Sequence, residues 1–435
     1  MIRRWLEYLR NVSASSPFLR HVATLMTGTA IAQVIVFLIM MIITRLFTRE
    51  TLGELGAFNS VVAIVVTVAA ARFDMTLMLE HDDRNAKVMA KLAMRCILVT
   101  AVVATIAAFP LRPWIAEHYS EDVARWMPLV GVTTVFMAGA AMLQYWYNRK
   151  TDYRTIAINR IQQQVGTSGG QVLCGAAGLL TLPGLLVGQL LGQGFAFVNL
   201  LVRAKDLRTL DTTGADSMRT LMRRHWKMPI LNGPNALIDA IRLNGINLMI
   251  GRVSLGDFGE FNLANQAVSI PVGLINSAVS QVFFQKLSVI EPGQMYREVV
   301  GSIKRALIIG IAPFAVFYAL APWIFPLVFG VEWQQAGYFA RALIPWMCML
   351  LVTSPISTMF VVTGTQHWLL AFAIVYCAAP LSWLVLSPYP LLPTIFGLGA
   401  INAACLVAMT VMALFAAKRY DARAEVRDAT PQCEE

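Results

Sequence analysis

The sequence predicts an all-α integral membrane protein with about twelve transmembrane helices in two six-helix bundles, related by a pseudo-two-fold axis along the membrane normal. Hydrophobic residues make up 57% of the 435 residues and charged residues only 14%, with a mean hydropathy of +0.61. A soluble fold could not bury this much apolar surface, so the solvent must be largely lipid. Recurrent long apolar runs and an internal repeat complete the prediction.

Apolar runs of roughly 19 to 27 residues recur from end to end, and each can cross a hydrocarbon core of about 30 Å. The second, fifth, seventh and eighth runs contain polar residues. The predicted spans are 22–44, 53–79, 92–115, 126–147, 155–179, 182–202, 229–250, 258–284, 304–330, 338–363, 368–387 and 391–417.

One short pattern occurs twice, 203 residues apart. Residues 49–59 read RETLGELGAFN and residues 252–262 read RVSLGDFGEFN. Each copy leads into the second long helix of its half, so the matching offset indicates that a six-helix unit was duplicated without inversion. Parallel repeats of this kind are typical of secondary transporters, which rock one half against the other.

The positions of lysine and arginine predict the orientation. With the N-terminus inside, cytoplasmic segments hold 27 of the 35 basic residues, so the positive-inside rule places both termini in the cytoplasm. The longest charged interval joins the two halves. The predicted organisation is a basic amphipathic N-terminus at 1–21, an N-terminal bundle at 22–202, a cytoplasmic linker at 203–228, a C-terminal bundle at 229–417 and a cytoplasmic tail at 418–435.

Several function classes are disfavoured by what the chain lacks. The six cysteines show no CxxC or Cys/His spacing, so neither a disulfide framework nor a metal site is predicted. There is no phosphate-binding loop motif for ATP hydrolysis. The short loops leave no room for an extramembrane catalytic domain. We therefore expect no catalytic residues, no cofactor and no enzyme activity, and we interpret the net charge of +10 as a topology signal, without a nucleic-acid partner.

The main ionisable residues inside predicted spans are Arg72 and Asp74 in the second and Asp239 and Arg242 in the seventh. Placing such a group in lipid costs roughly 2.5–3.5 kcal/mol on insertion scales, so each should face a cavity or a partner. In the seventh span, Asn232, Asn235, Asp239 and Arg242 are spaced by three, four and three residues and share one helical face.

Amides extend this pattern to other spans. The eighth span carries Gln266 and Asn276 on one face, and the first span carries Gln33. We interpret these residues as the wall of a hydrated central cavity in which Arg242 and Arg72 bind an anion, since the guanidinium fork matches phosphate oxygens. The alternative is structural: small and amide residues pack membrane helices together, Arg72 extends to the inner headgroups, and Arg242 pairs with Asp239.

Asp74 and Asp239 are candidates for ion coupling, carrying a proton or a sodium ion through the transport cycle. The alternative is that each carboxylate neutralises a neighbouring arginine. The sequence leaves both interpretations open.

Two stretches resemble the polysaccharide-transport flippases of the multidrug/oligosaccharidyl-lipid/polysaccharide exporter superfamily. Residues 44–53 (TRLFTRETLG), followed by Arg72-Phe73-Asp74 and residues 81–86 (HDDRNA), resemble the family's TRLYSPEDFG, RYE and DD-x-x-A. Residues 259–264 (GEFNLA) and 280–288 (SQVFFQKLS) resemble its GLYSLA and SQVFFPRLS. Among the departures from these patterns, Arg49 and Gln285 replace proline, Asp74 replaces glutamate, and Phe261 replaces tyrosine.

The resemblance implies a multi-pass flippase of the bacterial inner membrane that moves an undecaprenyl-diphosphate-linked glycan outward by alternating access. Its expected partners are that glycan, membrane lipids, a coupling proton or sodium ion, and a polymerase or export machinery. A small-molecule or multidrug cation antiporter on the same architecture is the main alternative, and a membrane-embedded glycan polymerase or ligase is a third. The flippase predicts a net-positive cavity, whereas the antiporter predicts an acidic or apolar one.

Overall fold

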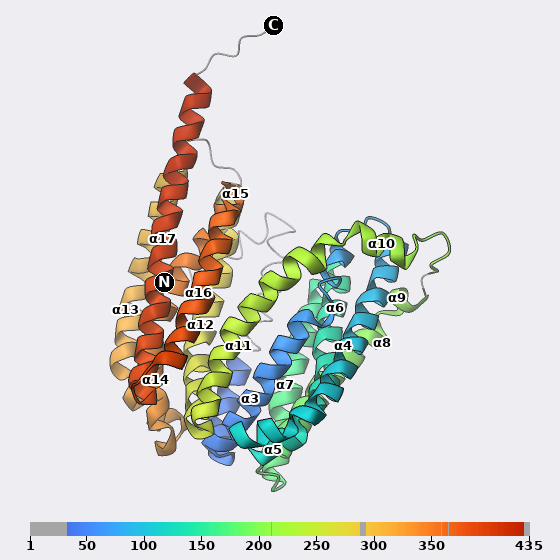
Figure 1. The fold of residues 1–435 in the computed structure, drawn as a ribbon, viewed down its shortest axis with the longest axis vertical. Coiled ribbons are helices and arrows are strands. Elements are labelled where there is room, and N and C mark those ends of the chain that lie inside the picture. The colour runs from blue at the N-terminus through green and yellow to red at the C-terminus, as the bar shows by residue number, and fades with distance from the viewer. Residues whose placement is uncertain (1–32, 210, 288–292, 358, 364, 430–435) are drawn as a thin grey trace. The chain divides into compact units, whose positions relative to one another are not determined.

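A computed structural model describes residues 33–209, 211–287, 293–357, 359–363 and 365–429. The described chain is 88% helix, and no strand occurs in it, which confirms the predicted all-helical class (Figure 1). The chain divides into two compact units, Met1–Gly259 and Glu260–Glu435. The predicted amphipathic segment at 1–21 and residues 430–435 of the predicted tail lie outside the described residues.

Seven helices in the described ranges are long and apolar enough to cross a membrane, so the chain is a multi-pass membrane protein. Two shorter apolar helices, Gln33–Leu46 and Ala371–Leu386, also coincide with predicted spans. Each of the twelve predicted spans overlaps a helix. That all twelve cross the bilayer, as two six-helix bundles about a pseudo-two-fold axis, remains a prediction.

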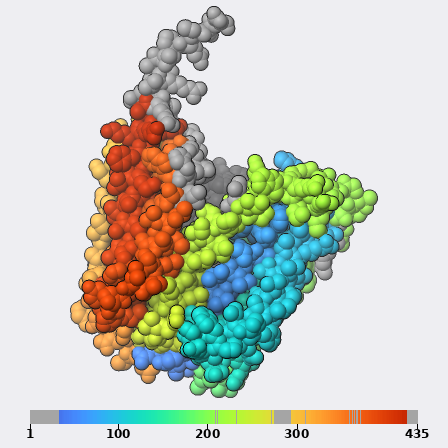
Figure 2. Space-filling view, in the orientation of Figure 1, coloured from blue at the N-terminus to red at the C-terminus, as the bar shows by residue number. Residues whose placement is uncertain are grey.

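The first unit contains the helix Gln33–Leu46, the helices α3 to α11, and the start of α12. In chain order, the labelled elements are α3 (Arg49–Ala69), η1 (Met75–Met78), α4 (Asp83–His118), α5 (Glu121–Trp126), η2 (Met127–Leu129), α6 (Val130–Arg149), α7 (Tyr153–Ala176), α8 (Leu182–Arg203), α9 (Lys205–Thr209), α10 (Met218–Arg224), the π-helical turn η3 (Met228–Asn232), α11 (Gly233–Val253) and α12 (Leu255–Leu287). Figure 2 shows α3 between α11 and α4 on the face toward the viewer.

The second predicted span was placed too far along the chain, at 53–79, because α3 ends at Ala69. Ala71 and Arg72 adopt left-handed backbone conformations, with φ of 47° and 58°. A helix cannot continue through such residues, because the left-handed region is unfavourable for residues with a Cβ. The chain therefore turns after Ala69, and the separate short helix η1 follows.

Helices α7 and α8 form a hairpin that is packed through glycines. A Cβ on Gly166 would lie 3.0 Å from the Cα of Gly192, and a Cβ on Gly188 would overlap the backbone nitrogen of Gln171. Because no side chains separate the backbones, polar groups of the two helices can pair: Asn159 Nδ2 donates to the carbonyl oxygen of Ala196 at 2.8 Å. This packing gives the polar helix α7 a partner for its amides.

Replacing Gly188 with alanine should destabilise the first unit by about 1–3 kcal/mol, because the added methyl group must push the two helix backbones apart. Gly169→Ala in the same hairpin is the matched control, since a Cβ there meets nothing within 4 Å. The midpoint of thermal unfolding in detergent measures both variants. Equal midpoints for the two would contradict the close packing of this hairpin.

The second unit continues α12 from Glu260. It then contains α13 (Met295–Phe329), η4 (Val331–Trp333), α14 (Gln334–Ile356), α15 (Met359–Val362), α16 (Gln366–Leu386) and α17 (Leu391–Ala429). The predicted cytoplasmic tail at 418–435 therefore begins inside α17. Within this unit, α13 and α17 both pack against α14.

Two buried carboxylates cap helix N-termini in the second unit. Glu260 is 0% exposed, and its Oε2 accepts a hydrogen bond of 2.7 Å from the backbone nitrogen of Ala336 in α14. Asp421 accepts from the backbone nitrogens of Met295 and Tyr296, at 3.1 and 2.8 Å, where α13 begins. Free N–H groups and the helix dipole both favour a negative charge at this position.

Arg341 of α14 compensates a proline in α13. Pro322 has no N–H, so the carbonyl of Tyr318 lacks its usual helical donor. Arg341 Nε donates to that carbonyl oxygen at 2.8 Å, and Nη2 donates to the Ala319 oxygen at 3.1 Å. The guanidinium carbon also lies 5.3 Å from the centre of the Tyr318 ring. This arginine is thus used to join two helices.

Packing divides the chain at Gly259, whereas the repeat and the charged interval place the join between halves at 203–228. The difference arises because α11 packs along α3 and thereby belongs to the first unit. Packing and duplication are different properties of a chain, so the predicted bundle boundaries at 22–202 and 229–417 stay a prediction.

Candidate functional site

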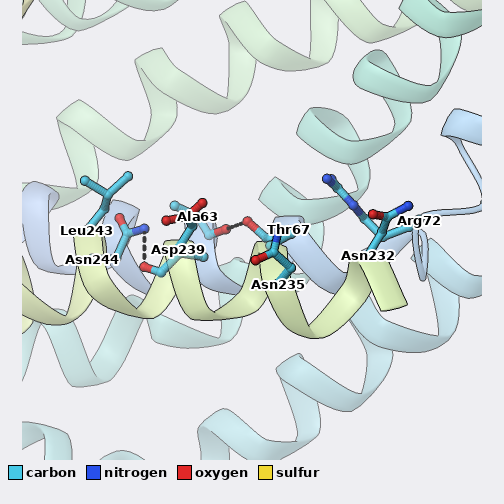
Figure 3. A pocket seen from close by; sticks show the side chains of 10 residues that line it. Ala63, Thr67, Arg72, Asn232, Asn235, Asp239, Leu243 and Asn244 are labelled. Atoms are coloured by element: carbon cyan, nitrogen blue, oxygen red, sulfur yellow. Dashed lines mark hydrogen bonds between the residues drawn. The ribbon is translucent and has the colours of Figure 1, made fainter. Parts of the chain in front are cut away.

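A cavity of about 340 Å³ lies within the first unit, between α3, the turn that follows it, and α11. Half of its polar side chains come from α11, and the others come from α3, the turn after α3 and η3 (Figure 3). The lining residues are Ala63, Thr67, Arg72, Asn232, Asn235, Ala236, Asp239, Ala240, Leu243 and Asn244.

One face of α11, continued by the last residue of η3, forms most of the cavity wall. Asn232, Asn235, Asp239 and Leu243 follow one another at spacings of three and four residues, and all four line the cavity. At about 100° per residue, Leu243 lies at the centre of this face, and Arg242 lies at its edge, roughly 20° beyond Asn235. Arg242 is not among the lining residues, and its Nη2 lies 3.5 Å from Oδ1 of Asp239.

The turn after α3 places Arg72 at one end of the cavity, beside Asn232, while Leu243 and Asn244 lie at the opposite end (Figure 3). The left-handed backbone of Arg72, with φ of 58°, is unfavourable for a residue with a long side chain. Such strained residues cluster at functional sites, where the surrounding structure holds them in place. The Nε atom of Arg72 is buried and has no hydrogen-bond partner among the described residues.

Arg72 and Asp239 are the ionisable residues of this lining. The Asp239 side chain is 60% exposed, and its Oδ1 lies 3.5 Å from Nη2 of Arg242 on the same helix. With one cation and one anion, the described lining has a formal charge of zero. It is neither the net-positive wall expected for a diphosphate nor the acidic wall expected for an organic cation.

The structure brings four of the predicted site residues together: Arg72, Asn232, Asn235 and Asp239. Arg242 is only 9% exposed and forms the ion pair with Asp239 that was the alternative interpretation. The anion-binding role predicted for Arg242 therefore stays a prediction.

Four further predicted residues are not among the described residues that line this cavity. Asp74 is buried two residues after Arg72, and its Oδ1 has no hydrogen-bond partner among the described residues. Gln33 is half-buried at the start of the helix Gln33–Leu46, and Gln266 is exposed in the second unit. Asn276 lies on α12, but its side chain is outside the described part of the chain. The substrate-binding and ion-coupling roles of these residues stay predictions.

Two polar lining residues were missed from the sequence. Thr67 Oγ1 donates to the Ala63 oxygen at 2.8 Å, and Asn244 Nδ2 donates to the Ala240 oxygen at 2.9 Å. Both side chains bond to their own helix, which hides their polarity in an apolar segment. Ala63 and Thr67 are four residues apart and so share one face of the helix that leads to Arg72. This spacing could have indicated Thr67 as a lining residue. Across the described ranges, no group of three His, Cys, Asp or Glu residues could hold a metal ion.

At the outer end predicted for the first unit, the two copies of the repeated pattern pack against each other. A Cβ on Gly53 would overlap the carbonyl oxygen of Leu255, and a Cβ on Gly259 would overlap the carbonyl oxygen of Arg49. These glycines therefore let the start of α12 lie directly on α3. The repeat found in the sequence marks a place where its two copies meet.

Two hydrogen bonds add to this outer contact. Tyr119 Oη donates to the Leu248 oxygen of α11 at 3.0 Å, and burial raises the pKa of the Tyr119 hydroxyl, which keeps it a donor. Ser120 Oγ donates to Glu54 Oε1 of α3 at 2.7 Å. The loop between α4 and α5 thus holds α3 and α11 together at this end.

Comparisons with known proteins were made on sequence and on fold. A family model described as "Polysaccharide biosynthesis protein" matches residues 42–337. None of the curated protein sequences matches the chain.

Several solved structures share the fold. The lipid II flippase MurJ in an inward closed conformation has a TM-score of 0.70 at 12% identity, covering 92% of this chain and 90% of its own. The MATE multidrug transporter DinF-BH has a TM-score of 0.63 at 17% identity, covering 90% and 95%. A transporter of the MOP superfamily from Pyrococcus furiosus has a TM-score of 0.59 at 13% identity, covering 92% and 96%. At these identities the likeness is one of fold.

Proposed function

The chain belongs to the polysaccharide biosynthesis protein family, and from this premise we propose that it is a flippase for a lipid-linked glycan. The substrate is an undecaprenyl-diphosphate-linked oligosaccharide or polysaccharide repeat unit, moved from the inner to the outer leaflet of the bacterial inner membrane. The MurJ likeness adds support, because MurJ is by its name a flippase of a lipid-linked molecule. No chemical step is needed for this transfer.

The observation that carries the proposal is the position of Arg72 beside Asn232 and Asn235 in one cavity. A guanidinium group binds phosphate oxygens through paired N–H donors and stays charged at any working pH. Amide side chains both donate and accept hydrogen bonds, which suits sugar hydroxyls. The prenyl chain of the substrate needs no such site, since it can remain in lipid.

The cavity would act by removing an electrostatic barrier. A diphosphate that crosses hydrocarbon without protein must lose its water, and even after relaxation this costs several kcal/mol per charge. A polar cavity replaces that water with fixed donors. Alternating access would then open the cavity to one side of the membrane at a time. Asp74 and Asp239 are our candidates for coupling to a proton or sodium ion, and a polymerase or export machinery would receive the glycan.

A small-molecule or multidrug cation antiporter is the second candidate. It is favoured by Asp239, whose carboxylate is 60% exposed in a cavity that also holds neutral amides. The fold likeness to DinF-BH, a MATE multidrug transporter, is in line with this alternative.

Vesicles containing the full-length protein can distinguish the two candidates. The flippase probe is undecaprenyl diphosphate carrying a short fluorescent glycan, with a membrane-impermeant quencher reporting the leaflet of the label. The antiporter probe is the organic cation tetraphenylphosphonium. We expect the protein to accelerate transfer of the lipid-linked glycan and to leave the cation distribution unchanged. Cation transport without glycan transfer would replace the flippase by the antiporter.

A further inference from the structure

Glu80 is a buried carboxylate at the cytoplasmic end predicted for the first unit, outside the cavity lining. Its side chain is 6% exposed, and its Oε1 lies 2.6 Å from Nε2 of His225, whose side chain is 13% exposed. Nη1 of Arg224 lies 3.6 Å from the same oxygen. Glu80 therefore joins the loop between η1 and α4 to the end of α10, 145 residues later in the chain.

Both of these segments lead directly into the cavity wall. The chain runs from Arg72 through η1 to Glu80 on one side, and from His225 through the π-helical turn η3 to Asn232 on the other. Arg72 and Asn232 are the two residues that lie together at one end of the cavity (Figure 3). A single carboxylate thus connects the two segments that position them.

The loop that carries Glu80 is itself firmly held. Arg149 at the end of α6 is mostly buried, with 12% of its side chain exposed. Its guanidinium donates to the backbone oxygens of Leu77 at 3.0 Å, of Glu80, and of His81 at 2.9 Å. Because three carbonyls converge on one guanidinium, the loop has a fixed place on α6.

The linker side is anchored by Leu221 of α10, which is 0% exposed in a core cluster of the first unit, and by several polar contacts. Arg224 Nη2 lies 2.7 Å from Asp216 Oδ2, and the Asp216 nitrogen donates to Asn85 Oδ1 at 2.9 Å. Arg84 Nη1 donates to the Thr213 oxygen at 2.9 Å. These bonds are exposed or only partly buried, so water competes for them and each contributes little. The bond between Glu80 and His225 is more enclosed, since their side chains are 6% and 13% exposed, against 40% and 49% for Asp216 and Arg224.

We propose that Glu80 is a positioning residue that holds Arg72 and Asn232 at the spacing an anionic headgroup requires. This inference rests on the proposed function, because the headgroup is that of the lipid-linked glycan. Removing the carboxylate leaves the largely enclosed His225 side chain, which is 13% exposed, without this partner, and a polar group that loses its partner away from water is costly. The start of α11 is then free to move away from the turn that carries Arg72.

Distances between two spin labels test this proposal without any substrate. The labels are attached at Met78→Cys and Ile230→Cys, both exposed positions on either side of the Glu80–His225 bond, in a full-length chain whose six native cysteines are replaced by serine. We expect a narrow distance distribution for the parent, and a broader distribution for Glu80→Ala and for His225→Ala. The exchanged pair, Glu80→His with His225→Glu, restores the bond and should restore the narrow distribution.

Two further variants make the result specific. Asp211→Asn is the matched control, because this linker carboxylate bonds within its own loop, to the Thr213 nitrogen at 3.1 Å, and it should leave the distribution narrow. Should Glu80→Ala fail to fold, Glu80→Gln keeps the size of the side chain and should broaden the distribution less. A distribution that stays narrow in Glu80→Gln and His225→Ala overturns the proposal.

Surface glycan in the source cells provides the functional measurement. We expect Glu80→Ala to lower glycan export by about 10- to 100-fold, as the loss of a hydrogen bond to a charged group would, and the exchanged pair to recover most of it. If deleting the gene leaves surface glycan unchanged, the proposed function fails while the spin-label result stands. If deletion abolishes the glycan but Glu80→Ala exports it normally, the positioning role fails alone.

Discussion

Arg72→Ala should reduce outward transfer of the lipid-linked glycan by about 100-fold, while the protein still inserts and folds. The guanidinium of Arg72 lies in the cavity with a buried Nε that has no hydrogen-bond partner among the described residues. Because Arg72 lines the cavity, we expect its guanidinium to pair with a substrate phosphate, and charge-assisted hydrogen bonds contribute about 1.5–3 kcal/mol, so that losing one costs a factor of roughly 10 to 150. The vesicle assay with fluorescent lipid-linked glycan measures this change.

Three companion variants separate charge, geometry and backbone strain. Arg72→Lys should keep part of the activity if charge suffices, and little if paired donors matter. Arg72→Gly suits the φ of 58°, since glycine adopts this conformation without cost, so it should fold at least as well as Arg72→Ala and transport equally poorly. Arg242→Ala, at an arginine that does not line the cavity, tests the other predicted anion-binding residue in the same assay. Normal transfer by Arg72→Ala would exclude Arg72 as the anion-binding residue.

Gly53→Ala should destabilise the first unit by about 2–3 kcal/mol, because its Cβ would overlap the backbone oxygen of Leu255. Backbone atoms cannot move aside as a flexible side chain can, so the start of α12 must separate from α3. The midpoint of thermal unfolding in detergent provides the measurement. A second expected effect is greater access of a thiol reagent to Ser254→Cys, in a chain lacking its native cysteines.

Gly256 occupies the same position as Gly53 in the other copy of the repeat, which makes Gly256→Ala a matched control. Its Cβ would lie 3.0 Å from Oε1 of Glu50, a side chain that is 55% exposed and can move. Alanine also has a higher helix propensity than glycine by about 1 kcal/mol. We therefore expect little loss or a small gain in stability. Equal destabilisation by the two substitutions would show that the contact through Gly53 is not special.

The helices could largely be predicted from the sequence, because a membrane allows few alternatives. Every predicted span overlaps a helix, since apolar runs of bilayer length must bond their own backbone groups. The end of α3 was missed by about ten residues. The helix ends because Ala71 and Arg72 adopt left-handed backbone conformations. Alanine and arginine rarely adopt this conformation, so the sequence does not indicate the turn.

The candidate site was predicted less completely. Helical spacing correctly grouped Asn232, Asn235 and Asp239, but it also placed Arg242, at the edge of the same face, in the cavity wall. Which edge of a helix face lines a cavity depends on the neighbouring helix, and here that is α3. Glu80 was missed because its partner His225 is 145 residues away, and no local pattern connects a loop glutamate to a linker histidine.

Hybrid transporters, made by exchanging halves between homologues to change glycan selectivity, would have to be joined after Gly259. A junction at 203–228 would pair a foreign α11 with the native α3, so that two surfaces shaped in different proteins would face each other across the cavity. A junction before His225 would also break the bond between Glu80 and His225 wherever the homologue lacks the residue it must supply. Chimeras joined after Gly259 keep both contacts within one parent.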